Sequence, residues 1–322
     1  VLKGDTYPLS VSAERNHQAI ALVEYAQLLG VSAIAHGSTA AGNDQVRFDM
    51  VFQTLAPELE ILTPIRDLQL SREEEIEFLQ KNGVDISFRK AKYSINKGLW
   101  GTSVGGAETL SSHLPLPEEA YPSSCSEKEP IAISISFTQG EPTALNGESM
   151  SPIDCIKRLN ELGSAYALGR DIHVGDTIIG IKGRVGFEAP AALLLIKSHQ
   201  LLEKHCLSKW QQHWKKQLAD WYGMFLHEAM YQEPVMRNIE CFLSDTQTNV
   251  SGTVELRLHP YRFELLGVKS GYDLMQADFG SYGEMNKKWT AADVKGFTRI
   301  YGNALAVQHS LQHKALKRRR KG

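Results

Sequence analysis

A run of small and polar residues at positions 36–49 carries the side chains most suited to binding a charged ligand. It reads His-Gly-Ser-Thr-Ala-Ala-Gly-Asn-Asp-Gln-Val-Arg-Phe-Asp. It follows the apolar segment Val31–Ala35 and leads into a helix-like segment, Gln45–Leu55, so the expected order is strand, glycine-rich loop, helix. Backbone N–H groups at the start of such a helix favour a carboxylate or a phosphate above the loop.

The polar side chains of this run differ in what they can bind. Thr39 and Asn43 can donate or accept hydrogen bonds, Asp44 can hold an ammonium group, and Arg47 is a planar donor fork that suits a carboxylate. A site with both charges fits a zwitterionic amino acid. The alternative is that Asn43 or Asp44 caps the helix and Arg47 is solvated. The spacing alone leaves both interpretations open.

The surrounding residues predict the elements that must position this loop. Arg15–Leu29 has apolar residues at helical spacing, Leu59–Thr63 reads as a second strand, and Ser71–Glu74 is a capping box that opens a helix to Asn82. Strands that alternate with helices indicate a parallel sheet, whose ligands lie at the C-terminal ends of its strands. The loop at 36–43 follows such an end.

The sequence changes character after residue 88 and predicts an α+β region with an antiparallel sheet. Its expected strands include Ile131–Phe137, Thr177–Lys182, Thr253–Leu258 and Arg262–Val268. Its expected helices are Ser151–Leu162, Ala191–His205, Lys209–Met230 and a terminal helix from Ala291 to about Leu316. The predicted fold class is therefore α/β followed by α+β.

Composition excludes several classes of protein. The formal net charge of −2 gives no reason to expect a nucleic acid partner, and no apolar run has the ~20 residues that span a bilayer. The cysteines Cys125, Cys155, Cys206 and Cys241 form no Cys-x-x-Cys pair, which favours free thiols in a reducing cytosol. The basic segment 314–321 is interpreted as a solvated tail, with a nucleic acid or membrane role as the alternative.

Two further patterns are assigned to structure rather than chemistry. His227-Glu228 begins like a zinc-protease helix, but Tyr231 stands where the second histidine is required, so we expect no metal site there. Trp210, Trp214 and Trp221 lie at helical spacings and are interpreted as core or subunit-contact residues.

The loop at 36–49 resembles the amino-acid-binding loop of the argininosuccinate synthase family. Four other segments resemble that family in the same order, and the resemblance covers roughly residues 4 to 302. They are Tyr-Pro-Leu-Ser-Val-Ser-Ala-Glu-Arg at 7–15, Lys-Tyr-Ser-Ile-Asn at 92–96, Gly-Ile-Lys-Gly-Arg-Val-Gly-Phe-Glu at 180–188 and Thr-Asn-Val-Ser-Gly-Thr-Val at 248–254.

The resemblance implies a carbon–nitrogen ligase of arginine biosynthesis that joins citrulline to aspartate. The ureido oxygen of citrulline attacks the α-phosphate of ATP, which gives a citrullyl-adenylate and pyrophosphate, and the aspartate amine then displaces AMP. Neither step needs a covalent enzyme intermediate, so no catalytic nucleophile is expected. ATP would arrive with Mg²⁺, for which no protein ligand is assigned.

The resemblance also implies a set of binding residues. Thr39, Asn43 and Asp44 would hold aspartate, and Gly37 would approach ATP through its backbone. The residues implied for citrulline are Tyr7, Ser12, Asn43, Arg47, Ser94 and Ser103.

Two positions depart from the family pattern. Many members have a glutamate that contacts citrulline where this chain has Gly175, and a tyrosine where it has Phe187. The neighbouring Asp176 is a candidate to replace the lost carboxylate, whereas the phenol hydroxyl has no substitute.

The family's Ser-Gly-Gly-x-Asp-Thr-Ser loop, which wraps the pyrophosphate of ATP, does not occur in this sequence. We therefore expect the chain to lack the first strands of the nucleotide-binding domain, to bind its amino acids weakly and to be inactive in this form. The alternative is a non-catalytic amino-acid-binding or oligomer-forming homologue that has lost its ATP loop. An adenylating enzyme that acts on tRNA or amides is disfavoured, because the second region also resembles the synthase.

The resemblance divides the chain into three parts. Residues 1–88 would be the remainder of the nucleotide-binding domain, 89–289 the synthetase and multimerisation domain, and 290–322 a C-terminal oligomerisation helix with a basic tail. Such a helix reaches a neighbouring subunit in the family, so a cytoplasmic homotetramer is implied.

Overall fold

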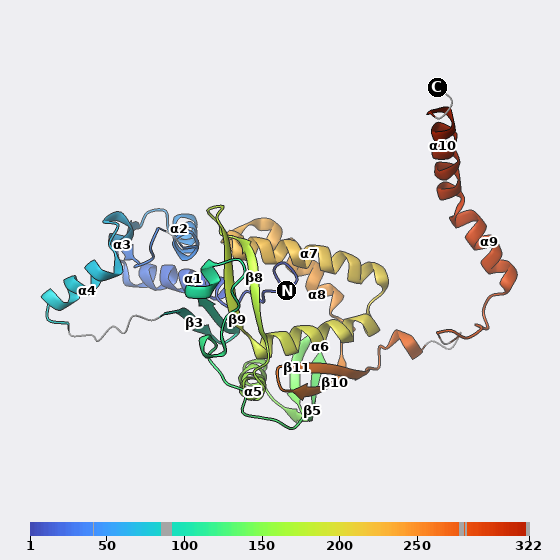
Figure 1. The fold of residues 1–322 in the computed structure, drawn as a ribbon, viewed down its shortest axis with the longest axis horizontal. Helices are drawn as coiled ribbons and strands as arrows, with labels where there is room; N and C mark the ends of the chain where they lie inside the picture. The colour runs from blue at the N-terminus through green and yellow to red at the C-terminus, as the bar shows by residue number, and fades with distance from the viewer. Residues whose placement is uncertain (41, 85–91, 277–279, 281, 320–322) are drawn as a thin grey trace. The chain divides into compact units, whose positions relative to one another are not determined.

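The computed structural model describes residues 1–322 except 41, 85–91, 277–279, 281 and 320–322 (Figure 1). It forms two compact units, Val1–Asp273 and Leu274–Gly322. The predicted domain boundary at 88 and 89 falls within 85–91, outside the described residues, and the division into three domains stays a prediction.

The first unit begins with the predicted strand, loop and helix. Strand β1 (Ala33–Ala35) pairs in parallel with β2 (Glu60–Leu62). Helices α1 (Ser12–Leu29) and α2 (Asp44–Leu55) pack against each other. Their apolar faces bury one cluster together with β1, which contains Ala19, Val23, Ala26, Ile34, Val51, Phe52 and Ala56. The parallel pairing predicted from the sequence is confirmed.

Two short helices follow β2. They are α3 (Pro64–Asp67) and α4 (Arg72–Lys81). The predicted capping box at the start of α4 is present, because Ser71 accepts from the backbone N–H of Glu74 and the Glu74 carboxylate accepts from that of Ser71. This reciprocal pair satisfies N–H groups that the first turn of a helix leaves free.

The rest of the first unit contains two antiparallel sheets (Figure 1). The four-stranded sheet has the order β3-β4-β9-β8, from β3 (Ser94–Gly98), β4 (Gly101–Gly105), β8 (Arg170–Asp176) and β9 (Lys182–Glu188). The five-stranded sheet has the order β11-β10-β5-β6-β7, from β5 (Ile131–Thr138), β6 (Glu141–Leu145), β7 (Glu148–Ser149), β10 (Gly252–His259) and β11 (Arg262–Lys269).

Long helices pack beside these sheets and complete the core. They are α5 (Pro152–Ala165), α6 (Pro190–Cys206), α7 (Lys209–His227) and α8 (Pro234–Thr246). Short 3₁₀ helices lie at Ala107–Leu110, Glu118–Ala120, Met230–Gln232 and Leu274–Gln276. The alternating residues Ile133, Ile135 and Phe137 of β5 are buried in one cluster with Leu194 and Leu202 of α6. The predicted antiparallel α+β region is confirmed.

The strand predicted at Thr177–Lys182 is wrong. Residues 177–181 form the turn that joins β8 to β9, closed by hydrogen bonds from Thr177 N to Ile181 O (2.8 Å) and from Gly180 N to Thr177 O (2.9 Å). Gly180 adopts φ +86°, a left-handed conformation that glycine adopts readily. The apolar run at 178–181 therefore marks a hairpin end rather than a strand.

Helix α7 is shorter than predicted, and its tryptophans are not core residues. The helix ends at His227, and Ala229 adopts φ +64°, which stops it before Met230. Trp210, Trp214 and Trp221 are 56–64% exposed. The prediction that they are core residues is wrong, and the alternative, a subunit contact, stays a prediction.

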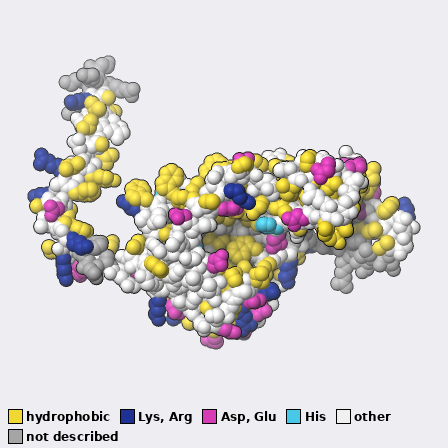
Figure 2. All heavy atoms as spheres, turned by 180° about the vertical axis from the view of Figure 1, so that it is seen from behind, with side chains coloured by type: hydrophobic (Ala, Val, Ile, Leu, Met, Phe, Trp, Pro, Cys, Tyr) yellow, Lys and Arg dark blue, Asp and Glu magenta, His cyan; other side chains and the backbone are white. Residues whose placement is uncertain are grey.

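Among the described residues of the second unit, two α-helices lie where one was predicted. Helix α9 (Ala291–Tyr301) begins at a capping box on Thr290, and α10 (Asn303–Arg319) follows after Gly302. Hydrophobic side chains gather along this unit (Figure 2), among them Val294, Phe297, Ile300 and Tyr301, which are 45–79% exposed. Residues 320–322 of the basic tail lie outside the described residues. No helix in the described parts of the chain is long and apolar enough to cross a bilayer.

Candidate active site

The glycine-rich loop leaves the C-terminal end of β1 and is anchored by His36. The ring atom Nδ1 of His36 accepts from the backbone N–H of Ser38 (3.3 Å), and Nε2 donates to Asp49 Oδ1 of α2 (2.8 Å). Arg66 holds the second oxygen of Asp49 at 2.6 Å. These contacts fix the first residues of the loop against α2.

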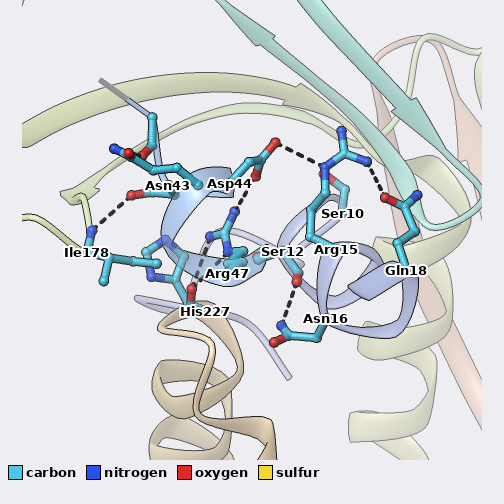
Figure 3. Close-up of polar contacts among 12 residues, drawn as sticks. Ser10, Ser12, Arg15, Asn16, Gln18, Asn43, Asp44, Arg47, Ile178 and His227 are labelled. Carbon is cyan, nitrogen blue, oxygen red and sulfur yellow. Dashed lines mark hydrogen bonds and ion pairs between the residues drawn. The ribbon is translucent and has the colours of Figure 1, made fainter. Parts of the chain in front are cut away.

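Arg47 of α2 is buried, with 4% of its surface exposed. Its Nε and Nη2 atoms each donate to the carbonyl oxygen of His227 (3.1 Å), and Nη1 donates to Asp44 Oδ1 (3.0 Å; Figure 3). Burial lowers the pKa of Arg47, and the Asp44 carboxylate opposes that shift. The alternative of a solvated Arg47 is wrong. Three of the five guanidinium N–H groups are used within the protein, so two remain for a ligand.

Asp44 lies between two arginine side chains. Its Oδ2 accepts from Arg15 Nε of α1 (3.0 Å), while Oδ1 accepts from Arg47 (Figure 3). The carboxylate is one-third exposed, so its remaining lone pairs face solvent. Two cations hold the carboxylate in place, and it can still accept from a ligand ammonium.

Asn43 joins the loop to the four-stranded sheet. Its Oδ1 accepts from the backbone N–H of Ile178, in the turn between β8 and β9, at 2.9 Å (Figure 3). The Asn43 side chain makes no capping hydrogen bond to α2. The structure therefore does not support the interpretation of Asn43 as a helix cap.

A cavity of about 410 Å³ opens where the loop meets the antiparallel sheet and the end of α7. Seven of the residues implied by the resemblance line it, namely Tyr7, Ser12, Thr39, Asn43, Asp44, Arg47 and Ser103. Gly37 and Ser94 are not in its lining. Gly37 lies near Ile65, and Ser94 is exposed on β3 opposite Gly105. The structure thus brings seven predicted residues from three segments of the chain to one cavity.

Tyr7 is fixed by a tight turn at the start of the chain. Lys3 and Tyr7 exchange backbone hydrogen bonds, from Lys3 N (2.8 Å) and from Tyr7 N (3.0 Å). The Tyr7 hydroxyl lies 3.2 Å from Ser10 Oγ, and burial raises the pKa of the phenol. The Tyr7 ring packs against those of His173 and Phe187, each at 5.5 Å.

The departures from the family pattern have clear structural settings. Phe187 is fully buried beneath Tyr7, and Asp176 lines the cavity while its carboxylate pairs with Lys182 at 2.6 Å. A Cβ atom at Gly175 would lie 2.6 Å from His173 Nε2, so the His173 ring occupies the space beside this glycine.

Sequence reasoning missed several residues of the cavity wall. They include Lys3, Asn96, His173, Arg184 and His227. The sequence presents His227 only within a segment that begins like a zinc-protease helix. Asn96 had a usable signal, since it lies in the family-like segment 92–96, two residues from Ser94. Lys3 and His173 belong to no motif.

Lys3 and His227 interact directly at this wall. Lys3 Nζ lies 2.9 Å from His227 Nδ1. Burial, followed by the positive charges of Arg47 and Lys3, lowers the pKa of His227 to about 3. Burial likewise lowers the pKa of Lys3 and of His173. At neutral pH the two histidines are therefore uncharged, and the basic side chains that line the cavity include Lys3, Arg47 and Arg184.

In comparisons with known proteins, two family models match successive parts of the chain. A family model described as the arginosuccinate synthase N-terminal HUP domain matches residues 2–85, and one described as the arginosuccinate synthase C-terminal domain matches residues 93–308. Similar proteins include the argininosuccinate synthases of Methanocaldococcus jannaschii (35% identity) and Dictyoglomus thermophilum (36%), each matched over 92% of this chain and 75% of its own length. That of Dehalococcoides mccartyi is 35% identical over 95% of this chain and 76% of its own length.

Proposed function

Because this chain belongs to the argininosuccinate synthase family, we propose that it joins a ureido amino acid, citrulline, to aspartate at the expense of ATP. The ureido oxygen attacks the α-phosphate and releases pyrophosphate, and the aspartate amine then displaces AMP from the adenylate. The observation that carries this proposal is the cavity itself, where seven family-like binding residues from separate segments meet.

The chemistry of the cavity suits positioning rather than covalent catalysis. Asp44, held between Arg15 and Arg47, offers an anion to the aspartate ammonium, with Thr39 and Asn43 beside it. The two unused N–H groups of Arg47 are available to the citrulline carboxylate. Fixed charges and donors of this kind bring reactants into line and stabilise developing charge.

The remaining assignments extend the same proposal. Tyr7, Ser12 and Ser103 contact citrulline from the cavity wall, and Asn43 contacts both amino acids. Ser94 reaches citrulline and Gly37 approaches ATP only when the ligands extend beyond the described cavity. Mg²⁺ enters with the ATP phosphates, and the enzyme works in the cytoplasm as a homotetramer.

Amino-acid binding is the most direct test. Unlike ATP turnover, it does not depend on the family's pyrophosphate loop, which does not occur in this sequence. Isothermal titration calorimetry should detect binding of aspartate, weakened by Asp44→Asn, and binding of a ureido carboxylate, weakened by Arg47→Leu. A second assay follows the two products of ATP separately: pyrophosphate should form only when the ureido compound is present, and AMP should be released only when aspartate is present as well. If neither aspartate nor the ureido carboxylate binds, the proposed function is overturned.

A further inference from the structure

One face of the four-stranded sheet forms the floor of the cavity, and we call it the sheet floor. Residues that pair across antiparallel strands, and residues two apart on one strand, lie on the same face. The pairing of Ser103 with Phe187 places β4 and β9 in register, and positions 183, 185 and 187 of β9 share a face. Three pairs on that face line the cavity, namely Asn96 with Ser103, His173 with Val185, and Gly175 with Gly183.

These six residues of the sheet floor carry no ionised side chain at neutral pH. They comprise an amide, a hydroxyl, an apolar side chain, two glycines and one histidine. Burial, and secondly the charge of Lys3, lowers the pKa of that histidine, His173, so its ring is neutral. The charges proposed for the amino-acid ends of the substrates, Asp44 and Arg47, belong instead to α2. The floor therefore suits an uncharged part of a ligand.

Three further ionised residues line the cavity, and each contacts another part of the protein. Lys3 Nζ lies 2.9 Å from His227 Nδ1, and Asp176 pairs with Lys182 at 2.6 Å. Arg184 donates to two backbone carbonyl groups. It also alternates with the floor residues along β9, so its side chain belongs to the opposite face of the sheet. None of these charges is part of the sheet floor.

Asn96 has the largest hydrogen-bonding capacity on the sheet floor. Its carboxamide has one acceptor oxygen and two N–H donors, and within the described parts of the chain this side chain has no hydrogen-bond partner. Ser103 lies directly opposite on β4 and is buried. The Cβ atoms of such a cross-strand pair are about 4.5–5.5 Å apart, so both polar side chains can contact one small group. Beside them, a Cβ atom at Gly183 would meet nothing within 4 Å, which leaves room for a ligand.

We propose that Asn96 binds the ureido group of citrulline and selects it over a charged group at the same position. The inference rests on the proposed function and adds a residue to which the resemblance assigned no role. With the citrulline carboxylate on Arg47, the methylene groups extend over the sheet floor and the neutral ureido end meets a neutral amide. A guanidinium or an ammonium group there would lose its hydration without gaining an opposite charge, which is unfavourable.

The same contact favours the proposed chemistry. Asn96 Oδ1 accepts from a ureido N–H, which leaves the ureido oxygen free to attack. As that oxygen bonds to the α-phosphorus, the bond from phosphorus to the pyrophosphate oxygen breaks, and positive charge develops on the ureido nitrogens. A fixed acceptor on one of their N–H groups stabilises this charge.

Three amino acids with the same α-carbon groups isolate the contribution of the ureido group. Citrulline carries the ureido group, arginine carries a guanidinium in its place, and norvaline is citrulline without it. Calorimetry on the wild-type protein should show that citrulline binds more tightly than either of the others. The contacts to Arg47 are common to all three, so differences between them report on the far end of the ligand.

Substitutions at Asn96 test the residue itself. Asn96→Ala should weaken citrulline binding about two- to tenfold, the range for loss of a neutral hydrogen bond, and leave norvaline binding unchanged. Asn96→Asp supplies a carboxylate of the same shape and should shift the ratio of arginine to citrulline affinity about tenfold or more toward arginine, because the new hydrogen bond is charge-assisted. Lys97→Ala is the matched control, since Lys97 is the next residue of β3, is exposed and lies on the opposite face. It should alter none of the three affinities.

Two measurements guard against variants that fold poorly. Thermal unfolding identifies any such variant, and aspartate titration shows whether the rest of the cavity still binds its ligand. The arginine-to-citrulline ratio is measured within one protein, so it does not depend on the fraction of that protein that is folded.

The outcomes distinguish this inference from the proposed function. If Asn96→Ala leaves citrulline binding unchanged or weakens norvaline equally, or if Asn96→Asp leaves the arginine-to-citrulline ratio unchanged, the inference is wrong while the ligase function stands. If neither aspartate nor citrulline binds the wild-type protein, the proposed function fails and the inference fails with it.

Discussion

The side-chain oxygen of Asn43 accepts a hydrogen bond from the backbone N–H of Ile178 at 2.9 Å. This contact ties the residue that precedes α2 to the turn between β8 and β9, so one wall of the cavity is held to another. Asn43 thus has a structural role through its oxygen and a proposed ligand role through its amide N–H groups.

The two roles of Asn43 can be separated by substitution. Asn43→Ala leaves the Ile178 N–H without its partner and should lower the free energy of unfolding by about 1 kcal/mol. Asn43→Asp retains an acceptor oxygen and should be closer to wild type in stability, yet it loses both amide donors and should bind aspartate less tightly. Urea unfolding and calorimetry measure the two effects. Equal loss of stability in both variants would contradict the structural role.

Asp44 and Arg47 should affect different substrates. Asp44→Asn removes the anion proposed for the aspartate ammonium, and Arg47→Leu removes a cation proposed for the ureido substrate's carboxylate. Loss of a charge-assisted hydrogen bond costs about 1.5–3 kcal/mol, or roughly ten- to over a hundredfold in affinity. We expect a raised aspartate Kd for the first variant and a raised ureido-substrate Kd for the second. Indistinguishable effects on both ligands would show that the roles are misassigned.

Arg47→Leu should also destabilise the protein, because the buried carbonyl oxygen of His227 loses two donors. An unsatisfied buried polar group costs about 1–3 kcal/mol. Arg47→Lys restores a positive charge but not the paired geometry and should recover only part of this loss. Urea unfolding of the three proteins gives the order, and equal stability of Leu and wild-type proteins would contradict it.

Stability should fall as the pH drops below 6.5, even before carboxylates titrate. The folded-state pKa of His227 is lowered from 6.5 to about 3, and the pKa values of His173 and His199 are also lowered by burial. At a pH between the folded-state and the unfolded-state pKa of each histidine, the unfolded chain binds a proton that the folded protein excludes. Each group therefore contributes a slope of up to roughly 1.4 kcal/mol per pH unit.

Unfolding free energies measured between pH 6.5 and 5 test this directly. His227→Gln should flatten the slope, since the glutamine oxygen can still accept from Lys3 but does not titrate there. His113→Gln, at an exposed position, is the control. A slope unchanged by His227→Gln would mean that this histidine protonates freely in the folded state.

The exposed stripe on α9 should mediate assembly. Val294, Phe297, Ile300 and Tyr301 form an apolar surface that is unfavourable in water. Deleting residues 290–322 should convert a tetramer into smaller species in sedimentation velocity. Replacing the four residues by serine should do the same, whereas Lys295→Ser on the same helix should not. An unchanged oligomer in both altered proteins would place the interface elsewhere.

Local signals in the sequence were enough for much of the fold. The capping box at Ser71, the alternation of Ile133, Ile135 and Phe137, and the periodicity of α1 each specify an element through neighbouring residues. The error at Thr177–Lys182 has the same origin, because an apolar run of that length fits a strand until the left-handed Gly180 closes a turn. The Trp residues of α7 show that helical spacing does not reveal whether a face is covered.

The site was only partly predictable for a different reason. The residue types of the 36–49 loop indicated an amino-acid ligand, and the resemblance added Tyr7, Ser12 and Ser103. The contacts that define their surroundings are long-range, and no local pattern encodes them. Lys3 meets His227 across 224 positions, and His173 reaches the cavity only because Gly175 lacks a side chain.

The distance along the chain between Arg47 and His227 has a consequence for how the protein is made. The carbonyl group that receives the Arg47 guanidinium is 180 residues downstream. At about 5–20 residues per second, a ribosome needs roughly ten to forty seconds to add that stretch. During this interval α2 can form and Arg47 can pair with Asp44, but the carbonyl oxygen that accepts from its Nε and Nη2 atoms has not yet been made. The nascent N-terminal segment is therefore expected to stay open, and exposed to chaperones, until the end of α7 has emerged.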